Sequence, residues 1–527
     1  MSRPENLETA RQLNVDERVA VSDGELEQVD NDGGISSSSA SSDDDMSDGK
    51  DKLLVTWEDG DPDCPYNMSK ARKWIVTLVI CVGSLCATAT SSVYTSTYAG
   101  IEREFGCSHI VAILGLSLYV MGLGIGPMLL APLSEFYGRR PIYLVSFACF
   151  VCFTLPTALA RNIETMLVGR FIGGLCGSAF LSVAGGTVGD MFLKHELGAP
   201  MMVYTASPFL GPALGPLMAG FINQNTSWRW TFWLTTIWSG AVLILLYFFC
   251  SETYHPVLLQ KKAAKLREET GLDYYAPMDR LTRSIPRTVA YSCLRPFQLL
   301  IFEPMVACLC TMTGFLLAVL YLFFQAFPKV FGGVYGFDLQ MTGCTFIGLS
   351  VGMIIGVLTD PIWKRVYRRL VEKREAKGLP LKPEYRLPPA MLGGILVPIG
   401  ILWFAFTSRE SIHWIVPIMG TTVFAIGVLL MFSGVFTFLV DAYPLFAASA
   451  MAANSISRSC LAAGFPLFSD AMYNKLGVVW GSALLGFLAL AMAPFPIIFF
   501  YYGERIRKNS RYAKPTTVEK REEKEKV

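Results

Sequence analysis

The sequence predicts an all-α membrane protein with two bundles of six helices each. The 527 residues are 52% hydrophobic and only 17% charged, whereas soluble proteins carry roughly 25% charged residues. Apolar runs of about 20 residues, enough to cross a ~30 Å hydrocarbon core, recur from Trp74 onward. One long basic segment divides these runs into six plus six. The runs are too long and too uniformly apolar for the strands of a membrane barrel.

Twelve spans with approximate bounds follow from these runs. They are 75–97, 110–134, 141–160, 164–189, 198–222, 230–250, 299–328, 342–362, 388–407, 412–440, 446–471 and 478–501. Lys and Arg gather between the sixth and seventh spans and after the eighth, while the loops on the other side are nearly bare of them. By the positive-inside rule, both termini and the central loop are cytoplasmic. The basic runs are thus a topology signal, and no nucleic-acid partner is expected.

The chain divides into five parts. These are an acidic, Ser-rich, disordered tail (1–73), a first six-helix bundle (74–250), a basic central loop (251–298), a second six-helix bundle (299–503) and a charged tail (504–527). The first tail has too little apolar surface to offset chain entropy. Ser41, Ser42 and Ser47 lie beside aspartates and are candidate phosphorylation sites. The alternative is a tail that is only solvated.

Cysteine and histidine spacing gives no sign of a catalytic or metal site. Most of the 13 cysteines lie inside spans, where they are small buried residues and not a disulfide framework. The four histidines are scattered at span ends. We therefore expect no metal, no cofactor and no enzymatic activity.

The second span ends in GPMLLAPLSEFYGRRP at 126–141, which combines an acid, a glycine and two arginines in a short turn. Gly138 permits a tight bend, and Arg139 or Arg140 can then reach a carboxylate. Asp190, at the inner end of the fourth span, is the candidate partner. Glu135, Arg139, Arg140 and Asp190 are thus predicted to form a gate, which protonation of Asp190 would weaken. The alternative is that the loop only anchors topology.

The same pattern recurs in the second half at a constant offset. Asp360, Lys364 and Arg365 occupy the positions that correspond to Glu135, Arg139 and Arg140. This repeat predicts two bundles related by an axis along the membrane normal, with the substrate path between them.

The loop resembles the cytoplasmic loop signature of the major facilitator superfamily. Ala131 departs from it, since the signature usually begins with glycine, and Phe136 stands where a basic residue is common. Arg170, in MLVGRFIGGLCGSAF, resembles the fourth-helix pattern of this family, whose arginine is associated with proton coupling. A fixed positive charge lowers the pKa of a neighbouring titratable group. Because Arg170 is near the outer end of its span, snorkelling to the surface is the alternative.

SPFLGPALGPLMAGF at 207–221 is similar to the glycine-proline signature that marks antiporters in this superfamily. Gly211 and Gly215 lie on one face, where they allow a neighbouring helix to approach closely. Pro212 and Pro216 kink the same helix. The resemblance implies a helix that seals against proton leak and sets the bend used in switching. Proline-rich spans with a purely structural role are the alternative.

Further strings extend the resemblance over about 56–510. WRWTFW (228–233), SETYHPVLL (251–259), RPFQLLIFEP (295–304), PEYRLPPAMLGG (383–394) and FPLFSDAMYNKLGVVWGSALLGF (465–487) look like the fungal twelve-helix drug:proton antiporters. The group that they resemble includes multidrug and polyamine exporters of yeasts.

The second bundle holds the candidate pocket residues. Tyr321, Phe324 and Gln325 lie in YLFFQAFP, where core packing is as good an explanation as ligand contact. Gln325 stands where many relatives have a glutamate, so the charge that would attract a polyamine is lost. Asn454 and Arg458, four residues apart, share a face and are too polar to meet lipid.

The resemblance implies a proton-coupled antiporter in the plasma membrane of a fungus. It would export small amphipathic or cationic compounds, including drugs and polyamines such as spermidine. Its expected partners are a small-molecule substrate, protons and membrane lipid, and it is expected to be a monomer. A proton-coupled importer or uniporter, a transporter-like nutrient sensor and an internal membrane such as the endoplasmic reticulum or vacuole are the alternatives.

Overall fold

The computed structural model describes residues 53–58, 60–193, 196–280, 284–379, 381–507, 510 and 512. Ser41, Ser42 and Ser47 lie outside the described residues, so their predicted phosphorylation stays a prediction. The chain forms two compact units. Of the described residues, the first contains those up to Asn67 together with 255–280, and the second contains those of Met68–Tyr254 together with those from Ser284 onward.

The first unit is small and is organised around α12 (His255–Thr270), with the short helices η1 (Pro65–Asn67) and η3 (Pro277–Arg280). Leu54 forms an isolated parallel bridge with Tyr275. Val55 is buried and packs in a small apolar cluster with Leu259 of the helix. The central segment, predicted as a loop, therefore contains a helix that packs against the end of the N-terminal tail.

This packing corrects the prediction that the whole tail 1–73 is disordered. The described part, from Leu53 onward, supplies apolar side chains such as Trp57 that the Ser-rich stretch before it lacks. Lys262 and Asp61 form an ion pair of 2.6 Å beside this cluster. The Lys262 ammonium holds the pKa of the Asp61 carboxyl below its usual range.

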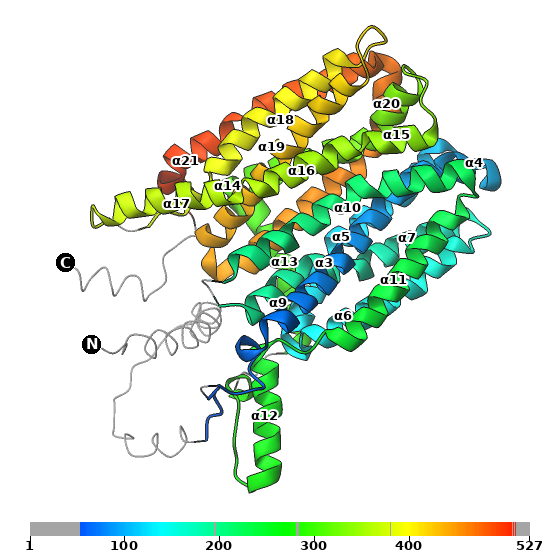
Figure 1. The fold of residues 1–527 in the computed structure, drawn as a ribbon. Helices are drawn as coiled ribbons and strands as arrows, with labels where there is room; N and C mark the ends of the chain where they lie inside the picture. Colours follow the sequence, from blue (N-terminus) through cyan, green and yellow to red (C-terminus); the bar gives the residue numbers. More distant parts are fainter. Residues whose placement is uncertain are drawn as a thin grey trace. The chain divides into compact units, whose positions relative to one another are not determined.

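The second unit contains both bundles (Figure 1). The first six spans are α3 (Lys70–Ser92) with η2 (Val93–Thr97) and α4 (Tyr98–Phe105), α5 (His109–Tyr137), α6 (Arg139–Ala158), α7 (Ile163–Gly177) with α8 (Ala179–Ser182) and α9 (Ala184–Met191), α10 (Gly198–Asn225), and α11 (Arg229–Phe249). An amphipathic helix, α13 (Ile285–Phe302), precedes the second bundle. It occupies the rest of the segment that was predicted as a loop.

The other six spans follow α13. They are α14 (Pro304–Phe327) with η4 (Pro328–Gly332), α15 (Leu339–Thr345) with α16 (Ile347–Leu358) and α17 (Asp360–Glu375), α18 (Pro388–Thr407) after η5 (Pro383–Arg386), α19 (Ile415–Ala442), and, after η6 (Pro444–Phe446), the two passes of α20 (Ala447–Met492) and α21 (Pro494–Arg507). Gly477, with φ 72°, interrupts α20 and separates these two passes.

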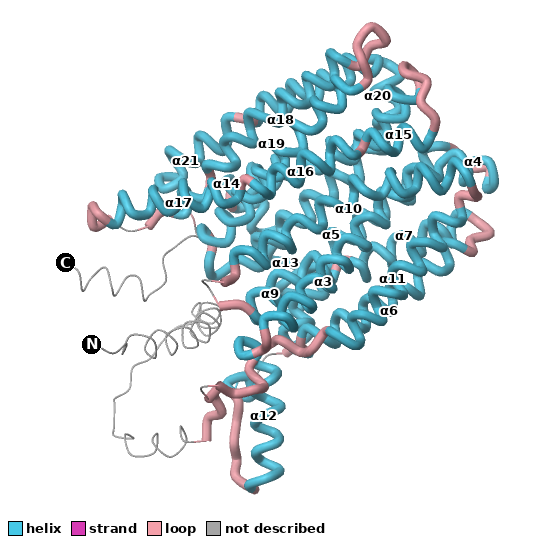
Figure 2. The backbone as a smooth tube through the Cα atoms, viewed as in Figure 1, coloured by secondary structure: helices cyan, strands magenta, loops and turns pink. Residues whose placement is uncertain are grey.

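The number of spans agrees with the prediction. Ten helical stretches among the described residues are long and apolar enough to cross a membrane, and the stretch Ala447–Arg507 holds two passes. The 28-residue α10, with its three prolines, is the twelfth. Figure 2 shows these helices joined by loops at the two ends of the unit. We call the end at which α3 begins the predicted cytoplasmic end and the other the predicted outer end, since orientation stays a prediction.

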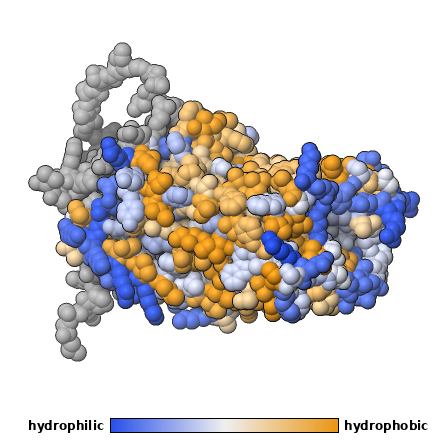
Figure 3. Space-filling model, turned by 90° about the horizontal axis from the view of Figure 1, so that it is seen from above, coloured by the Kyte–Doolittle hydropathy of each residue, from blue (hydrophilic) through white to orange (hydrophobic). Residues whose placement is uncertain are grey.

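The surface of the unit is suited to lipid. Figure 3 shows apolar side chains across the middle of the visible face and hydrophilic side chains toward its two ends. Large apolar residues such as Val145, Phe248 and Tyr501 are exposed on the helices. A soluble monomer rarely exposes so much contiguous apolar surface, so these side chains face the hydrocarbon core of a membrane.

Candidate functional site

The candidate site lies where the two bundles meet, and α10 is the helix at the centre of this contact. A Cβ atom at Gly211 or Gly215 would overlap the side chains of Thr88 or Ser92, so α10 and α3 pack closely at these glycines. On its other side, a Cβ at Gly220 would lie 2.8 Å from the Leu339 carbonyl oxygen of α15. The glycines of α10 therefore allow close packing within the first bundle and against the second.

Polar and aromatic contacts also join the bundles. The Ser91 and Tyr321 hydroxyls lie 2.8 Å apart. Phe209 of α10 stacks on Phe432 of α19, with 4.8 Å between ring centroids. The Ser117 hydroxyl of α5 donates to the carbonyl of Ala463 in α20 over 2.6 Å. Tyr321 is thus a contact residue between bundles in this conformation.

Arg170 is enclosed by the first bundle and is only 2% exposed. Its guanidinium donates to the carbonyl oxygens of Gly115 (3.2 Å), Thr90 (2.8 Å) and Ser91 (3.2 Å). Tyr119 and Tyr94 cover the charge, with ring centroids 4.3 and 4.5 Å from the guanidinium carbon. Carbonyls in the last turn of an α-helix lack intrahelical donors, and α3 ends at Ser92. The side chain therefore points inward, and the alternative of snorkelling is wrong.

No carboxylate pairs with Arg170 among the described residues, whose ion pairs lie elsewhere. The predicted titratable group beside this charge is therefore not in contact with it. Arg170 is instead linked to the second bundle through Ser91, which accepts from Arg170 with its carbonyl and contacts Tyr321 with its hydroxyl. The role of Arg170 in proton coupling stays a prediction.

The gate predicted at the cytoplasmic end has a definite geometry. Arg139 Nε lies 3.2 Å from Asp190 Oδ2, and the carboxylate-bearing residue is only 5% exposed. Arg139 Nη1 also donates to Ser134 over 2.6 Å. Arg140 is directed elsewhere and donates to the Tyr247 carbonyl over 3.2 Å. The structure thus pairs Asp190 with the first of the two arginines.

Glu252 also contacts Arg139 and Arg140, and the sequence alone did not predict this role. Its carboxylate accepts from the backbone amides of Arg139 (2.9 Å) and Arg140 (3.2 Å) at the beginning of α6. A carboxylate is favourable there because the first amides of a helix are unpaired and partly positive. Gly138 has φ 95°, and a Cβ on it would overlap the Glu252 carboxylate. An acid directly after the sixth span, on the side of the loop, was the available signal.

The corresponding charged residues of the second bundle, Asp360, Lys364 and Arg365, are arranged differently from those of the first. Lys364 pairs with Asp360 on its own helix over 2.6 Å. Its ammonium also lies 3.5 Å from the carbonyl of Gly198, where α10 begins. Glu135 and Arg365, which the repeat placed in the two loops, are both exposed. The repeat therefore preserves charge types, but Arg139 pairs with Asp190 of another helix whereas Lys364 pairs with Asp360 of its own helix.

A second charge cluster joins the bundles at the predicted outer end. The ring of His109 lies between Glu102 (Nδ1 to Oε1, 2.5 Å) of the first bundle and Asp470 (Nε2 to Oδ2, 2.8 Å) of the second. Lys329 pairs with the other oxygen of Asp470 over 3.0 Å. This cluster is not predictable from the scattered histidines, because residues so far apart along the chain give no local pattern. We call Glu102, His109, Lys329 and Asp470 the outer cluster.

The candidate pocket residues differ in their surroundings. Tyr321, Phe324 and Gln325 are almost fully buried, and Phe324 packs against Phe346 with centroids 5.5 Å apart, which favours core packing for this ring. Asn454 is committed to the Thr313 hydroxyl over 2.7 Å. Arg458 is half-buried, with its guanidinium carbon 5.6 Å from the ring centroids of Phe432 and Phe436.

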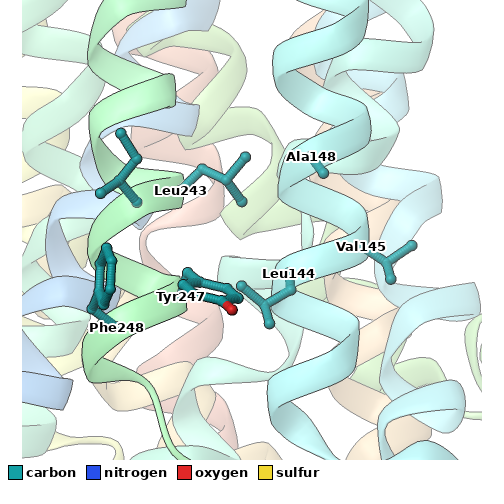
Figure 4. Close-up of a pocket in the computed structure, with 7 residues that line it drawn as sticks. Leu144, Val145, Ala148, Leu243, Tyr247 and Phe248 are labelled. Atoms are coloured by element: carbon teal, nitrogen blue, oxygen red, sulfur yellow. The ribbon is translucent and has the colours of Figure 1, made fainter.

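Figure 4 shows an apolar surface groove between α6 and α11, of about 520 Å³. Leu144, Leu243 and Tyr247 point into the space between the two helices. Its lining, which also includes Val145, Ala148, Ile244 and Phe248, belongs to the exposed apolar surface. We interpret this groove as lipid-facing and not as a substrate site.

Comparison with known proteins identifies the family to which this chain belongs. The family model of the Major Facilitator Superfamily matches residues 80–466, which is more than half of the chain. The chain belongs to the major facilitator superfamily. The structure of the proton:xylose symporter XylE has a TM-score of 0.59 and 15% identity, with 83% of this chain and 96% of that chain covered. At this identity, the likeness of XylE to the transporter shows the fold alone.

Fungal relatives specify the family further. A protein named efflux pump atB, from Aspergillus terreus, is 51% identical to the transporter over 88% of this chain and 90% of its own length. The probable drug/proton antiporter YHK8 of Saccharomyces cerevisiae is 41% identical, with 88% and 91% covered. A multidrug transporter of Aspergillus fumigatus, mdrA, is 40% identical, with 88% and 76% covered. The transporter is thus a member of the fungal drug:proton antiporter family and not an enzyme.

The pair of Asp190 and Arg139 leads to a first prediction. Asp190→Asn should lower the transport rate about 10-fold without loss of insertion, because the amide keeps the volume but removes the charge. Combined with Arg139→Gln in a double-mutant cycle, it should show a coupling energy of about 1 kcal/mol or more in transport rate. Glu375→Gln, which removes an exposed acid at the same end, is the control. Strictly additive effects would refute the pair.

The outer cluster leads to a second prediction. Asp470→Asn removes the charge that both His109 and Lys329 contact, so the bundles should separate more often at the predicted outer end. Spin labels at the exposed positions Arg103 and Lys475, one in each bundle, would report this by pulsed electron paramagnetic resonance. We expect a larger population at long distances than in wild type. An unchanged distribution, equal to that of the exposed-loop control Glu410→Gln, would contradict it.

Proposed function

We propose that the transporter is a proton-coupled antiporter that exports small amphipathic compounds across the plasma membrane of a fungal cell and acts as a monomer. The observation that carries this proposal is the 41% identity, over 88% of the chain, to a yeast protein named as a probable drug/proton antiporter. The names efflux pump and multidrug transporter of the other relatives support the direction and the substrate type. The glycine-rich contacts of α10 agree with the antiporter signature in its sequence.

Asp190 is the carboxyl group that we propose to exchange the proton. It is buried at the end of α9 and forms an ion pair with Arg139, a side chain that also has other partners. Protonation would remove the ion pair but leave the other contacts of Arg139 intact. Proton binding would thus loosen the gate, while proton release would close it again.

Drug-like compounds are better candidate substrates than polyamines. A polyamine needs several negatively charged or acceptor groups, and Gln325 supplies none of the charge that a glutamate would give there. The buried acids Asp190, Glu303 and Glu384 of the described residues already have protein partners. We therefore do not include polyamines in the proposed substrate class.

Transport by the purified protein in proteoliposomes tests this function. An imposed pH gradient should drive substrate uphill and move protons in the opposite direction, and its collapse by an ionophore should abolish both movements. Proton movement in the same direction as the substrate would identify a symporter instead. Substrate movement that is indifferent to the gradient would identify a uniporter.

Substitutions of Arg170 are the most informative variants for this assay. Arg170→Ala removes the charge and three hydrogen bonds to carbonyls of α3 and α5, including the bond to Ser91, whose hydroxyl contacts Tyr321 of the second bundle. We expect normal ligand binding but at least a ~10-fold loss of gradient-driven accumulation. Arg170→Lys keeps the charge but not the planar fork, so it should retain part of the activity. Full accumulation by the alanine variant at matched protein level would show that Arg170 has only a packing role.

A further inference from the structure

Arg458 is a charged side chain that no described residue pairs. It forms no hydrogen bond or ion pair with any described residue, and its Nε atom is buried without a partner. Arg458 is the twelfth residue of α20 (Ala447–Met492), so it lies roughly 17 Å along the helix, near the middle of its span. A guanidinium at this depth is costly unless an acceptor meets it.

The other buried or half-buried arginines show how the protein normally meets this cost. Arg170 has three carbonyl oxygens, and Arg507 forms two hydrogen bonds with Glu384. Arg229 donates to the carbonyls of Ala158 and Ala160. In contrast, the contacts of Arg458 with described residues are with the faces of two aromatic rings. None of its N–H groups therefore donates to an oxygen of these residues.

The surroundings of Arg458 are suited to a flat apolar group. Phe432 and Phe436 lie beside it, and Phe432 stacks on Phe209 of the first bundle. Arg458 therefore lies at the contact between the bundles, where a substrate path is expected in this fold.

We propose that Arg458 binds the substrate and that the preferred substrate is an amphipathic organic anion, an aromatic ring system that carries a carboxylate. The ring system packs against Phe432 and Phe436, and the carboxylate accepts from the guanidinium of Arg458. This inference rests on the proposed export function and narrows its substrate class. A cationic drug is disfavoured because it would approach an unneutralised positive charge in a region of low dielectric constant.

Three probes of one shape test this preference. They are 1-naphthaleneacetate, which is an anion at pH 7.5, neutral 1-naphthaleneacetamide and cationic 1-naphthalenemethylamine. Equilibrium binding to the full-length protein in nanodiscs, without a pH gradient, gives a dissociation constant for each. We expect the anion to bind at least ~10-fold more tightly than the amide, as a charge-assisted hydrogen bond would give. The amine should bind most weakly.

Variants of Arg458 test whether this side chain causes the preference for the anion. Arg458→Gln should reduce the anion-to-amide ratio to about 1 while amide binding persists, which also shows that the variant is folded. Arg458→Lys should keep part of the ratio, because it retains the charge without the planar fork. Arg409→Gln makes the same charge change in an exposed loop and should leave the ratio unchanged.

The inference is overturned if wild type binds the anion no more tightly than the amide, whether both bind well, weakly or not at all. It is equally overturned if Arg458→Gln keeps the wild-type ratio. These outcomes are distinct from a failure of the export function. Export of the amine in exchange for protons would support the proposed function and refute the preference for anions. Binding of the anion without proton-driven transport would support the preference for anions and refute the proposed function.

Discussion

A charge inside a bilayer must find its partner within the protein, and this constraint governs the rest of the structure. Arg170 is its clearest case, because three carbonyl oxygens from α3 and α5 surround the guanidinium. The Gly115 carbonyl is on α5, which packs closely against α7 where a Cβ at Gly174 would overlap the Tyr119 backbone. The buried charge, the glycines and the end of α3 are therefore one structural feature, which determines the interior of the first bundle.

The same constraint separates the ends of the transporter from its middle. At the two ends, the Asp190–Arg139 pair and the outer cluster join charged side chains of opposite sign. The Asp190–Arg139 pair lies within the first bundle, whereas the outer cluster joins the two bundles and can break and form again as they rock. In the middle, Arg458 has aromatic neighbours and no oxygen from any described residue. The proposals therefore assign conformational control to the ends and substrate recognition to the middle.

Much of the fold could be predicted from the sequence, because twelve long apolar runs and their charge asymmetry depend only on local composition. The pairing of Asp190 with an arginine was also predictable, since a buried acid near a basic loop has few other partners. Glu252 and the outer cluster were missed because their contacts join residues distant in sequence, such as His109 and Asp470. The depth of Arg170 left snorkelling open as an alternative, because its position in a span gives the distance to water but not the neighbours that enclose it.

The central claim is that charges with protein partners hold the structure, while Arg458, which has none among the described residues, binds the substrate. An experimental structure of the transporter with bound 1-naphthaleneacetate tests this claim most directly. The account predicts a carboxylate oxygen about 3 Å from a guanidinium nitrogen of Arg458, as in a hydrogen bond, and unchanged contacts of Arg170 with its three carbonyls. A ligand bound away from Arg458, or an Arg458 side chain paired with a carboxylate of the protein itself, would contradict the account.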